Sequence, residues 1–217
     1  MEKLYLKVQE KVQVNKDTWL IIFDEDFNFE PGQFIMVETP KLVRKPFVLG
    51  RWSDKSSISV QVKGEGTKWI VEESNFLKAH GPLGKPFTKQ AGKGLLIASP
   101  TCLTLANVIK EIFETDVLIG SRTPLIIDIP YKTAIGNEDF MNSLKNSMGY
   151  DWYLVYGSKN MQKTVYDIFK GKKLFFSLEE YMGCGIGACK SCAIETKHGI
   201  KHVCTDGPIF AGDELCW

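Results

Sequence analysis

Residues 94–113 read GLLIASPTCLTLANVIKEIF and mark the point at which the character of the chain changes. GLLIAS (94–99) is a short, wholly apolar run, and LTLANVIKEIF (103–113) repeats apolar residues at helical spacing. An apolar strand followed by an amphipathic helix is typical of a parallel sheet whose two faces are both covered. The stretch therefore predicts that an α/β module begins near residue 91.

The residues before this stretch predict β-structure. Four segments are rich in Val, Ile, Thr and aromatic residues and are separated by Pro, Gly, Asn and Asp: 4–14, 18–26, 32–40 and 57–64. Several short strands with turn residues at this spacing favour a small antiparallel barrel. Residues 67–75 predict one short helix across an end of that barrel.

Apolar strands and helices continue to alternate after residue 113, as in a parallel sheet. Strands are predicted at 116–121, 124–130, 150–158 and 173–177, and helices at 137–148 and 161–171. We therefore divide the chain into a β-barrel (1–90), an α/β module (91–176) and a segment dense in Gly and Cys (177–217). The last segment is too short to bury a core of its own and needs another source of stability.

Composition limits the partners of this 217-residue chain. Its 27 Lys and Arg residues balance 26 Asp and Glu residues, so the net charge indicates neither nucleic acid nor an anionic membrane as a partner. No apolar run approaches the ~20 residues needed to span a bilayer, and the first residues lack a signal-peptide core. We expect a cytoplasmic protein, in which clustered thiols are more often ligands than disulfides.

Four cysteines in the last segment have the spacing C-x4-C-x2-C-x11-C. They are Cys184, Cys189, Cys192 and Cys204. The first three reproduce the plant-type [2Fe–2S] spacing, and the glycines between them let a loop wrap closely around a cluster whose sulfurs need N–H donors. Structural zinc is the alternative, although zinc sites usually pair two C-x2-C knuckles and only Cys189 and Cys192 form one. Disulfides rank third.

Three stretches of the predicted barrel are compatible with a flavin, which can exchange electrons with both an iron–sulfur cluster and a hydride donor. EPGQF (30–34) is a turn that leads into a strand, and RKPFVL (44–49) places cations beside a Pro-stiffened strand. VKGEGTKWI (62–70) is a Gly-x-Gly-Thr turn before a helix, where N–H groups and a hydroxyl could hold phosphate. Taken singly, each stretch is also consistent with an ordinary turn or surface loop.

Together these motifs resemble the electron-transfer subunit of type B dihydroorotate dehydrogenase, within the ferredoxin reductase superfamily. PGQF, the basic-Pro-Phe strand, GxGT, GPLG (81–84) and SLEEYMGCGIGACKSC…VCTDGPIF (177–210) follow one another over nearly the whole chain. The resemblance implies an antiparallel flavin-binding barrel with FAD, a parallel-sheet module like a nucleotide domain, and a C-terminal [2Fe–2S] segment. It also implies a partner subunit that carries FMN and oxidises dihydroorotate in pyrimidine biosynthesis, with two copies of each subunit. Electrons would pass from FMN through the cluster to FAD and on to NAD.

Carried over by position, the resemblance implies nine FAD contacts, the four cysteines as cluster ligands, and no catalytic acid or base in this chain. The FAD contacts are Lys45, Pro46, Phe47, Val48, Ser59, Val60, Gln61, Gly66 and Thr67. Where the family has Arg-Pro-x-Ser, this chain has residues 45–48, so the cation loses its bidentate geometry and the strand loses a hydroxyl. We expect FAD to bind with altered redox tuning.

The nicotinamide side departs from the family pattern. A Gly-Gly-x-Gly-x-x-Pro loop is replaced by IASPTCLTLANV (97–108), which has no glycine, and a Cys-Gly-Pro element is replaced by residues 156–158, Tyr-Gly-Ser. Side chains in this loop would crowd a pyrophosphate, and Pro100 has no N–H to offer it. We predict that NAD binds weakly or not at all, and that a ferredoxin, a quinone-linked protein or another carrier accepts the electrons.

Two other functions use the same residues. One is a flavin and iron–sulfur NAD(P)H:ferredoxin-type oxidoreductase, independent or as the small subunit of a related complex; the missing glycine loop counts against it. The other is an interaction module in which the cysteine loop holds structural zinc.

Overall fold

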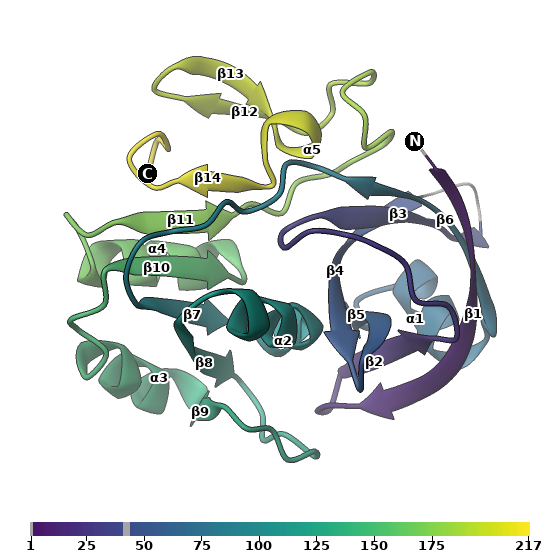
Figure 1. The fold of residues 1–217 in the computed structure, drawn as a ribbon, viewed down its shortest axis with the longest axis horizontal. Helices are drawn as coiled ribbons and strands as arrows, with labels where there is room; N and C mark the ends of the chain where they lie inside the picture. The colour runs from purple at the N-terminus through teal and green to yellow at the C-terminus, as the bar shows by residue number, and fades with distance from the viewer. Residues whose placement is uncertain (1, 41–43) are drawn as a thin grey trace.

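Six antiparallel strands close into a barrel in the N-terminal part of the computed structural model, which describes residues 2–40 and 44–217 (Figure 1). The strands are β1 (Glu2–Gln13), β2 (Thr18–Phe23), β3 (Phe34–Glu38), β4 (Arg44–Trp52), β5 (Lys55–Gln61) and β6 (Phe76–Leu83), in the order β1-β2-β5-β4-β3-β6. Alternate side chains such as Ile21, Ile35 and Ile58 are fully buried inside, as a period of two requires. The predicted barrel is confirmed.

A short helix covers one end of the barrel, as the sequence predicted. Helix α1 (Glu65–Glu72) follows β5 directly, and its residues Ile70 and Val71 are buried in the barrel core. The helix therefore places its N-terminus, with the turn Lys63–Gly64, beside the ends of the barrel strands.

A mainly parallel sheet forms the second half of the fold. Its elements are β7 (Gly94–Ala98), a 3₁₀ turn (Pro100–Cys102), α2 (Leu103–Ile112), β8 (Thr115–Ser121), β9 (Lys132–Ile135), α3 (Gly136–Lys145), β10 (Trp152–Tyr156), α4 (Lys159–Ile168) and β11 (Leu174–Ser177). The strand order is β14-β11-β10-β7-β8-β9. Helices α3 and α4 pack on one face of the sheet, whereas α2 lies between the other face and the barrel (Figure 1).

One predicted strand is wrong. Residues 124–130 form no strand in the described part of the chain, and the sheet takes residues 132–135 instead. The segment is bounded by Pro124 and Pro130, which have no N–H for a sheet ladder. Within it, the Ile126 N–H donates to the carbonyl of Val14 in the barrel (2.7 Å). Its apolar residues pack on the core as a loop rather than as a strand.

The barrel and the α/β module are joined by close backbone packing. A Cβ atom added to Gly50 of β4 would lie 2.1 Å from the carbonyl carbon of Thr104, so the first turn of α2 rests directly on the strand. The Asn107 side-chain amide donates to the carbonyl of Arg51 (2.8 Å), and the hydroxyls of Thr104 and Ser59 lie 3.3 Å apart. The N-terminus of α2 is therefore sealed against the barrel.

The C-terminal segment completes the sheet and then covers the barrel edge. Its elements are the hairpin β12 (Ala193–Thr196) and β13 (Gly199–His202), the one-turn helix α5 (Val203–Asp206) and β14 (Ile209–Ala211), which pairs antiparallel with β11. Met182, Val203 and Phe210 are buried in the same core as α3 and α4. The boundaries at residues 90 and 176 stay a prediction, since this segment shares its core with the module before it.

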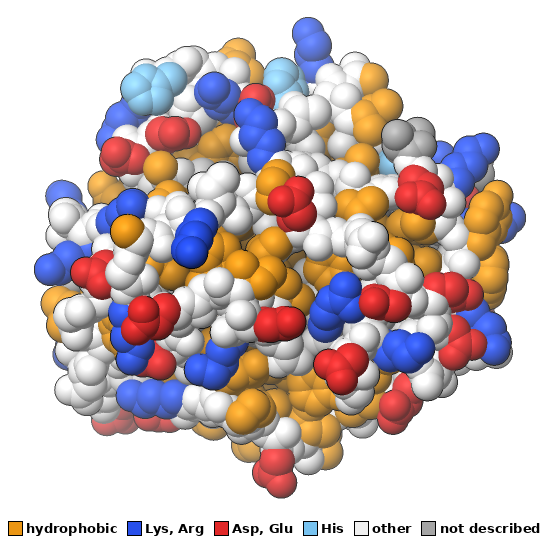
Figure 2. All heavy atoms as spheres, viewed as in Figure 1, with side chains coloured by type: hydrophobic (Ala, Val, Ile, Leu, Met, Phe, Trp, Pro, Cys, Tyr) orange, Lys and Arg blue, Asp and Glu red, His pale blue; other side chains and the backbone are white. Residues whose placement is uncertain are grey.

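Charge is evenly mixed on the face shown in Figure 2, where Lys and Arg side chains alternate with Asp and Glu side chains, as the balance of 27 and 26 suggests. Of the helices that the structure describes, none is both long enough and apolar enough to cross a membrane.

Candidate functional site

The four predicted cluster ligands come together at the edge of the barrel. Cys184, Cys189 and Cys192 lie on the loop between β11 and β12, and Cys204 lies on α5. The Cys192 and Cys204 sulfurs are 3.2 Å apart and buried, whereas Cys184 is half-buried and Cys189 is exposed. In the described residues all six cysteines are free thiols. The loop therefore presents one buried pair and two more accessible thiols.

Backbone N–H groups surround these sulfurs. The N–H groups of Ile186 and Cys189 donate to Cys184 Sγ (3.4 and 3.3 Å), and the Gly187 N–H donates to Cys204 Sγ (3.2 Å). Donors of this kind stabilise the negative charge of an iron–sulfur centre and tune its potential. Among the described residues, no three His, Cys, Asp or Glu side chains are grouped to hold a single ion. The paired sulfurs instead suit a centre of two irons with two thiolates each.

The pKa values of two of the thiols are shifted in opposite directions. Hydrogen bonding to Ser191, whose hydroxyl lies 3.1 Å from Cys189 Sγ, lowers the pKa of Cys189 to about 6. Burial, with the neighbouring Cys192, raises the pKa of Cys204 to about 12. The exposed ligand is thus ready as a thiolate at neutral pH, whereas the buried one must lose a proton when metal binds.

Barrel residues form the floor beneath this loop. Gly185 has a φ of +73°, and a Cβ atom there would lie 2.7 Å from Met36 Cγ and 2.8 Å from Leu83 Cδ1. The His80 Nε2 atom lies 3.0 Å from the carbonyl oxygen of Cys184. His80 could not be identified from the sequence, because no local pattern distinguishes a strand histidine that contacts a distant loop from any other strand histidine.

The barrel opens between β4 and β5, where the sequence predicted flavin contacts. The β4–β5 ladder runs from Trp52–Lys55 to Leu49–Ile58, and within the described residues 44–61 it has no further pair, although both strands continue. The Leu49 N–H donates to the Gln33 carbonyl on the β3 side (2.9 Å). Because antiparallel strands alternate, the N–H and C=O of Val48 point toward the opening. A planar ligand could occupy this position without breaking a ladder bond.

Lys45 and the N-terminus of α1 meet beside this opening. A Cβ atom on Gly66 would lie 2.7 Å from Lys45 Cε and 3.3 Å from Thr39 Oγ1, so glycine is needed for the lysine to lie across the first turn. Thr67 Oγ1 accepts from the N–H groups of Lys63 (2.9 Å) and Gly64 (3.2 Å) and fixes the shape of the turn. A cation above a helix N-terminus suits a pyrophosphate.

Several predicted contacts direct their side chains elsewhere. Phe47 and Val60 pack in the barrel core, and the Gln61 side-chain amide donates to Asp17 Oδ2 (2.8 Å). Ser59 Oγ accepts from the Thr104 N–H (3.4 Å) at the junction with α2. Because backbone direction alternates along a strand, the N–H and C=O groups of Ser59 and Gln61 face the opening, whereas those of Phe47 and Val60 face the neighbouring strands β3 and β2.

The predicted nicotinamide loop is closed by its own side chains. The hydroxyls of Ser99 and Thr101 lie 2.6 Å apart, and the thiol of Cys102 is buried, which raises its pKa to about 12. Tyr156, in place of the family's cysteine, is only 3% exposed, and its hydroxyl would be 3.5 Å from a Cβ on Gly32 in the EPGQF turn. Its ring therefore fills space between the sheet and the barrel.

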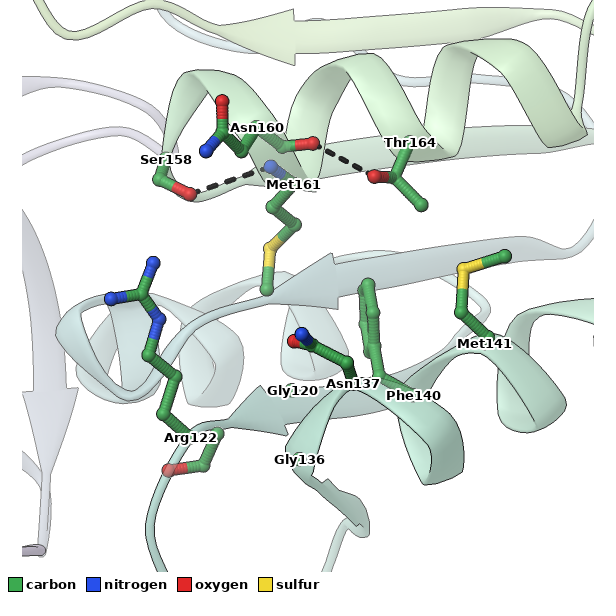
Figure 3. Close-up of a pocket in the computed structure, with 11 residues that line it drawn as sticks. Gly120, Arg122, Gly136, Asn137, Phe140, Met141, Ser158, Asn160, Met161 and Thr164 are labelled. Carbon is green, nitrogen blue, oxygen red and sulfur yellow. Dashed lines mark hydrogen bonds between the residues drawn. The ribbon is translucent and has the colours of Figure 1, made fainter.

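A separate cavity of about 680 Å³ opens at the carboxyl ends of β8 and β10 (Figure 3). Arg122 and Asn137 line it, together with the start of α4, where Ser158 Oγ accepts from the Met161 N–H (3.4 Å). Small ligands of α/β proteins commonly bind at this edge of the sheet. No sequence pattern indicates this cavity, since its walls come from separate helix and strand ends.

Fold and sites together define a ferredoxin reductase-like electron-transfer protein with an added iron–sulfur segment. The fold matches the structure of an NADH-dependent reduced ferredoxin-NADP oxidoreductase with a TM-score of 0.83 and 23% identity, over 98% of this chain and 90% of that chain. It matches the ferredoxin reductase of carbazole 1,9a-dioxygenase with a TM-score of 0.63 and 18% identity, over 81% and 68%. At these identities the likeness shows the fold.

The chain belongs to the family of dihydroorotate dehydrogenase B electron transfer subunits. It is 61% identical, over the full length of both chains, to a Thermotoga petrophila protein named as the electron transfer subunit of dihydroorotate dehydrogenase B (NAD(+)). A Pyrococcus horikoshii relative with the same type of name is 34% identical over 92% of this chain and 89% of its own length. Residues 179–216 match the model for the iron–sulfur cluster binding domain of dihydroorotate dehydrogenase B.

Family membership confirms the predicted electron-transfer subunit of an oxidoreductase complex and implies a catalytic partner subunit. The iron–sulfur domain supports a [2Fe–2S] cluster and the ferredoxin reductase-like fold supports FAD, as the sequence predicted.

Proposed function

We propose that this chain relays electrons between the FMN of a dihydroorotate-oxidising catalytic subunit and a further acceptor. The observation that carries the proposal is the set of four cysteine thiols, which accept hydrogen bonds from backbone N–H groups, on a loop that contacts β3 and β6 of a barrel whose β4–β5 ladder ends at Leu49 and Ile58. When bound, the cluster supplies one-electron exchange, and FAD connects it to two-electron chemistry. The chain itself supplies position, exclusion of water and tuning of potential.

We assign the cluster ligands as Cys184, Cys189, Cys192 and Cys204. For FAD, the backbone of Val48 would contact the ring system, and Lys45 with the first turn of α1 would hold the pyrophosphate. Of the other contacts carried over from the family, Ser59 and Gln61 would act through their backbone, since their side chains are engaged with Thr104 and Asp17. We also propose that the chain divides into a flavin-binding barrel (1–90), an α/β module (91–176) and an iron–sulfur segment (177–217).

We further propose that NAD binds weakly or not at all, although the relatives' names include NAD(+). Pro100 has no N–H, the hydroxyls of Ser99 and Thr101 bond each other, and α2 begins against Gly50. A pyrophosphate at this helix N-terminus would lack the N–H that Pro100 does not have, and it would meet side chains and a helix start already packed against the barrel. A ferredoxin-like protein or another carrier would then take the electrons. The complex would contain two copies of each subunit, in the cytoplasm, where clustered thiols stay reduced.

Co-expression with the FMN-bearing catalytic subunit tests the proposal. We expect a brown complex that contains FAD, iron and sulfide, and that transfers electrons from dihydroorotate to an artificial acceptor but not to NAD. Purification of a colourless chain with one zinc per subunit would contradict the cluster assignment. Efficient reduction of NAD would contradict the acceptor assignment and leave the relay intact.

A further inference from the structure

His80 connects the barrel to the cysteine loop through one hydrogen bond. This histidine lies on β6, is 5% exposed, and places Nε2 3.0 Å from the carbonyl oxygen of Cys184, 104 residues away in sequence. Because a carbonyl oxygen only accepts hydrogen bonds, Nε2 is the protonated nitrogen in this contact. The peptide that follows the first cluster ligand is therefore fixed by a side chain of the barrel.

The surroundings of this bond offer the carbonyl little else. Gly185, the next residue, packs against Met36 and Leu83, whose side chains have no N–H or O–H to donate. A partly buried carbonyl that loses its donor keeps its desolvation cost, which favours rotation of the peptide. Loss of the imidazole N–H would therefore move the Cys184 peptide rather than leave it in place.

Position in the barrel also places His80 between the two cofactor sites. Met36 on β3 pairs with His80 on one side and with Pro46, on the flavin strand, on the other. The cluster loop thus rests on β3 and β6, and β3 pairs with β4, the strand that borders the opening. A change in the position of the cysteine loop would therefore alter both the surroundings of the cluster and its distance from the barrel.

We propose that His80 is a positioning residue for the iron–sulfur centre: its N–H holds the Cys184 peptide so that the N–H groups of Ile186 and Cys189 donate to Cys184 Sγ. The inference rests on the proposed assignment of the four cysteines as cluster ligands. Donors to the sulfur stabilise the reduced cluster, which carries more negative charge. Without His80 these two bonds lengthen and the cluster's potential falls.

The test compares His80→Gln with His80→Leu in the full chain, reconstituted without oxygen with iron, sulfide and FAD. Glutamine carries an N–H donor at a reach similar to Nε2, whereas leucine fills the space without one. We expect His80→Leu to change the equilibrium constant for electron exchange with FAD about tenfold, a fall in cluster potential of about 59 mV, and to shift the g values of the reduced cluster. Glutamine restores both. His198→Leu, an exposed histidine on the hairpin, serves as the matched control and changes neither.

Each outcome decides the inference. Loss of the cluster in His80→Leu alone supports it, because only the donor differs between the variants. Equal potentials and spectra in wild type and His80→Leu overturn it. Loss of the cluster in both variants, with apo chains that unfold at the wild-type temperature, also overturns it, because the ring rather than the bond would then seat the loop. A wild-type chain without a [2Fe–2S] signal after reduction overturns the proposed ligand set itself, which separates that failure from the failure of His80.

Discussion

Two loops follow strands of the same sheet, one after β11 and one after β7. The first is built to bind a ligand, whereas the second is closed to one. After β11 the chain runs into the cysteine loop, where glycines remove side chains and N–H groups point at sulfur. After β7 it runs through Ser99–Cys102, where a proline removes a donor and two hydroxyls bond each other. A loop becomes a binding site when its backbone is exposed, and it is closed when its side chains satisfy one another.

The largest expected effect breaks the open loop. Cys192→Ser replaces a buried thiol whose sulfur lies 3.2 Å from Cys204 Sγ, and we expect complete loss of the cluster. The matched control is Cys102→Ser, which changes a buried cysteine in the closed loop and should keep full iron and sulfide content. Iron and sulfide assays on purified protein give the measurement. Equal loss in both variants would show that burial, not ligation, explains the result.

The second prediction concerns the closed loop. We expect micromolar NADH to leave the absorbance of the bound flavin unchanged in the complex, while dithionite bleaches it, because the loop lacks the Pro100 N–H and its helix start is packed against the barrel. Replacing Ser99, Pro100 and Thr101 together by glycine should bring measurable bleaching by NADH. Prompt stoichiometric bleaching of the wild-type complex would contradict the prediction.

A third prediction concerns the contact between β4 and the first turn of α2, which follows the closed loop. A Cβ atom at Gly50 would meet the Thr104 backbone at 2.1 Å, so Gly50→Ala should destabilise the chain by ~1–3 kcal/mol, the usual cost of overpacking. The control is Gly64→Ala, where no atom lies within 4 Å of the added Cβ, and it should cost less. Urea unfolding measures both. Equal midpoints would mean that α2 can move away from the barrel without loss.

The fourth prediction sharpens the assignment of the flavin opening. Lys45→Gln removes the cation above the first turn of α1, and the FAD dissociation constant should rise about tenfold, or about 1.4 kcal/mol. Lys78→Gln, an exposed lysine on β6, should leave FAD affinity unchanged. Fluorescence titration of the apo chain with FAD measures both. An unchanged FAD affinity in Lys45→Gln would contradict the assignment of the pyrophosphate to the first turn of α1.

The sequence predicted those parts whose chemistry fixes a local pattern. Ligation demands a set spacing, so the four cysteines were identifiable, and alternation with a period of two identified the barrel. Contacts between distant segments had no such pattern: His80 meets Cys184 over 104 residues, and Gly50 accommodates α2. Alternation also could not show that β4 and β5 separate beyond Leu49 and Ile58, which decides the face that Ser59 and Gln61 present to a ligand. The wrong strand at 124–130 followed from counting apolar residues without its two prolines.

The smallest expected effect lies away from both loops, on β8. Asp116 accepts hydrogen bonds from the Lys93 ammonium (2.8 Å) and from the Tyr150 hydroxyl (2.7 Å), and these two donors hold its pKa below the ordinary 3.8. Because the folded-state pKa is lowered, the stabilisation is fully present above pH 3.8 and is lost as the pH falls through the folded-state value. Asp116→Asn should therefore cost about 1 kcal/mol or less at pH 7, since the pair is exposed, and less still in acid. Urea unfolding of both proteins at pH 7 and near the acid limit of folding measures the difference. If the difference in the free energy of unfolding between wild type and Asp116→Asn grew as the pH fell, the prediction would be wrong. The sheet that carries both loops would then not depend on the charge of this carboxylate.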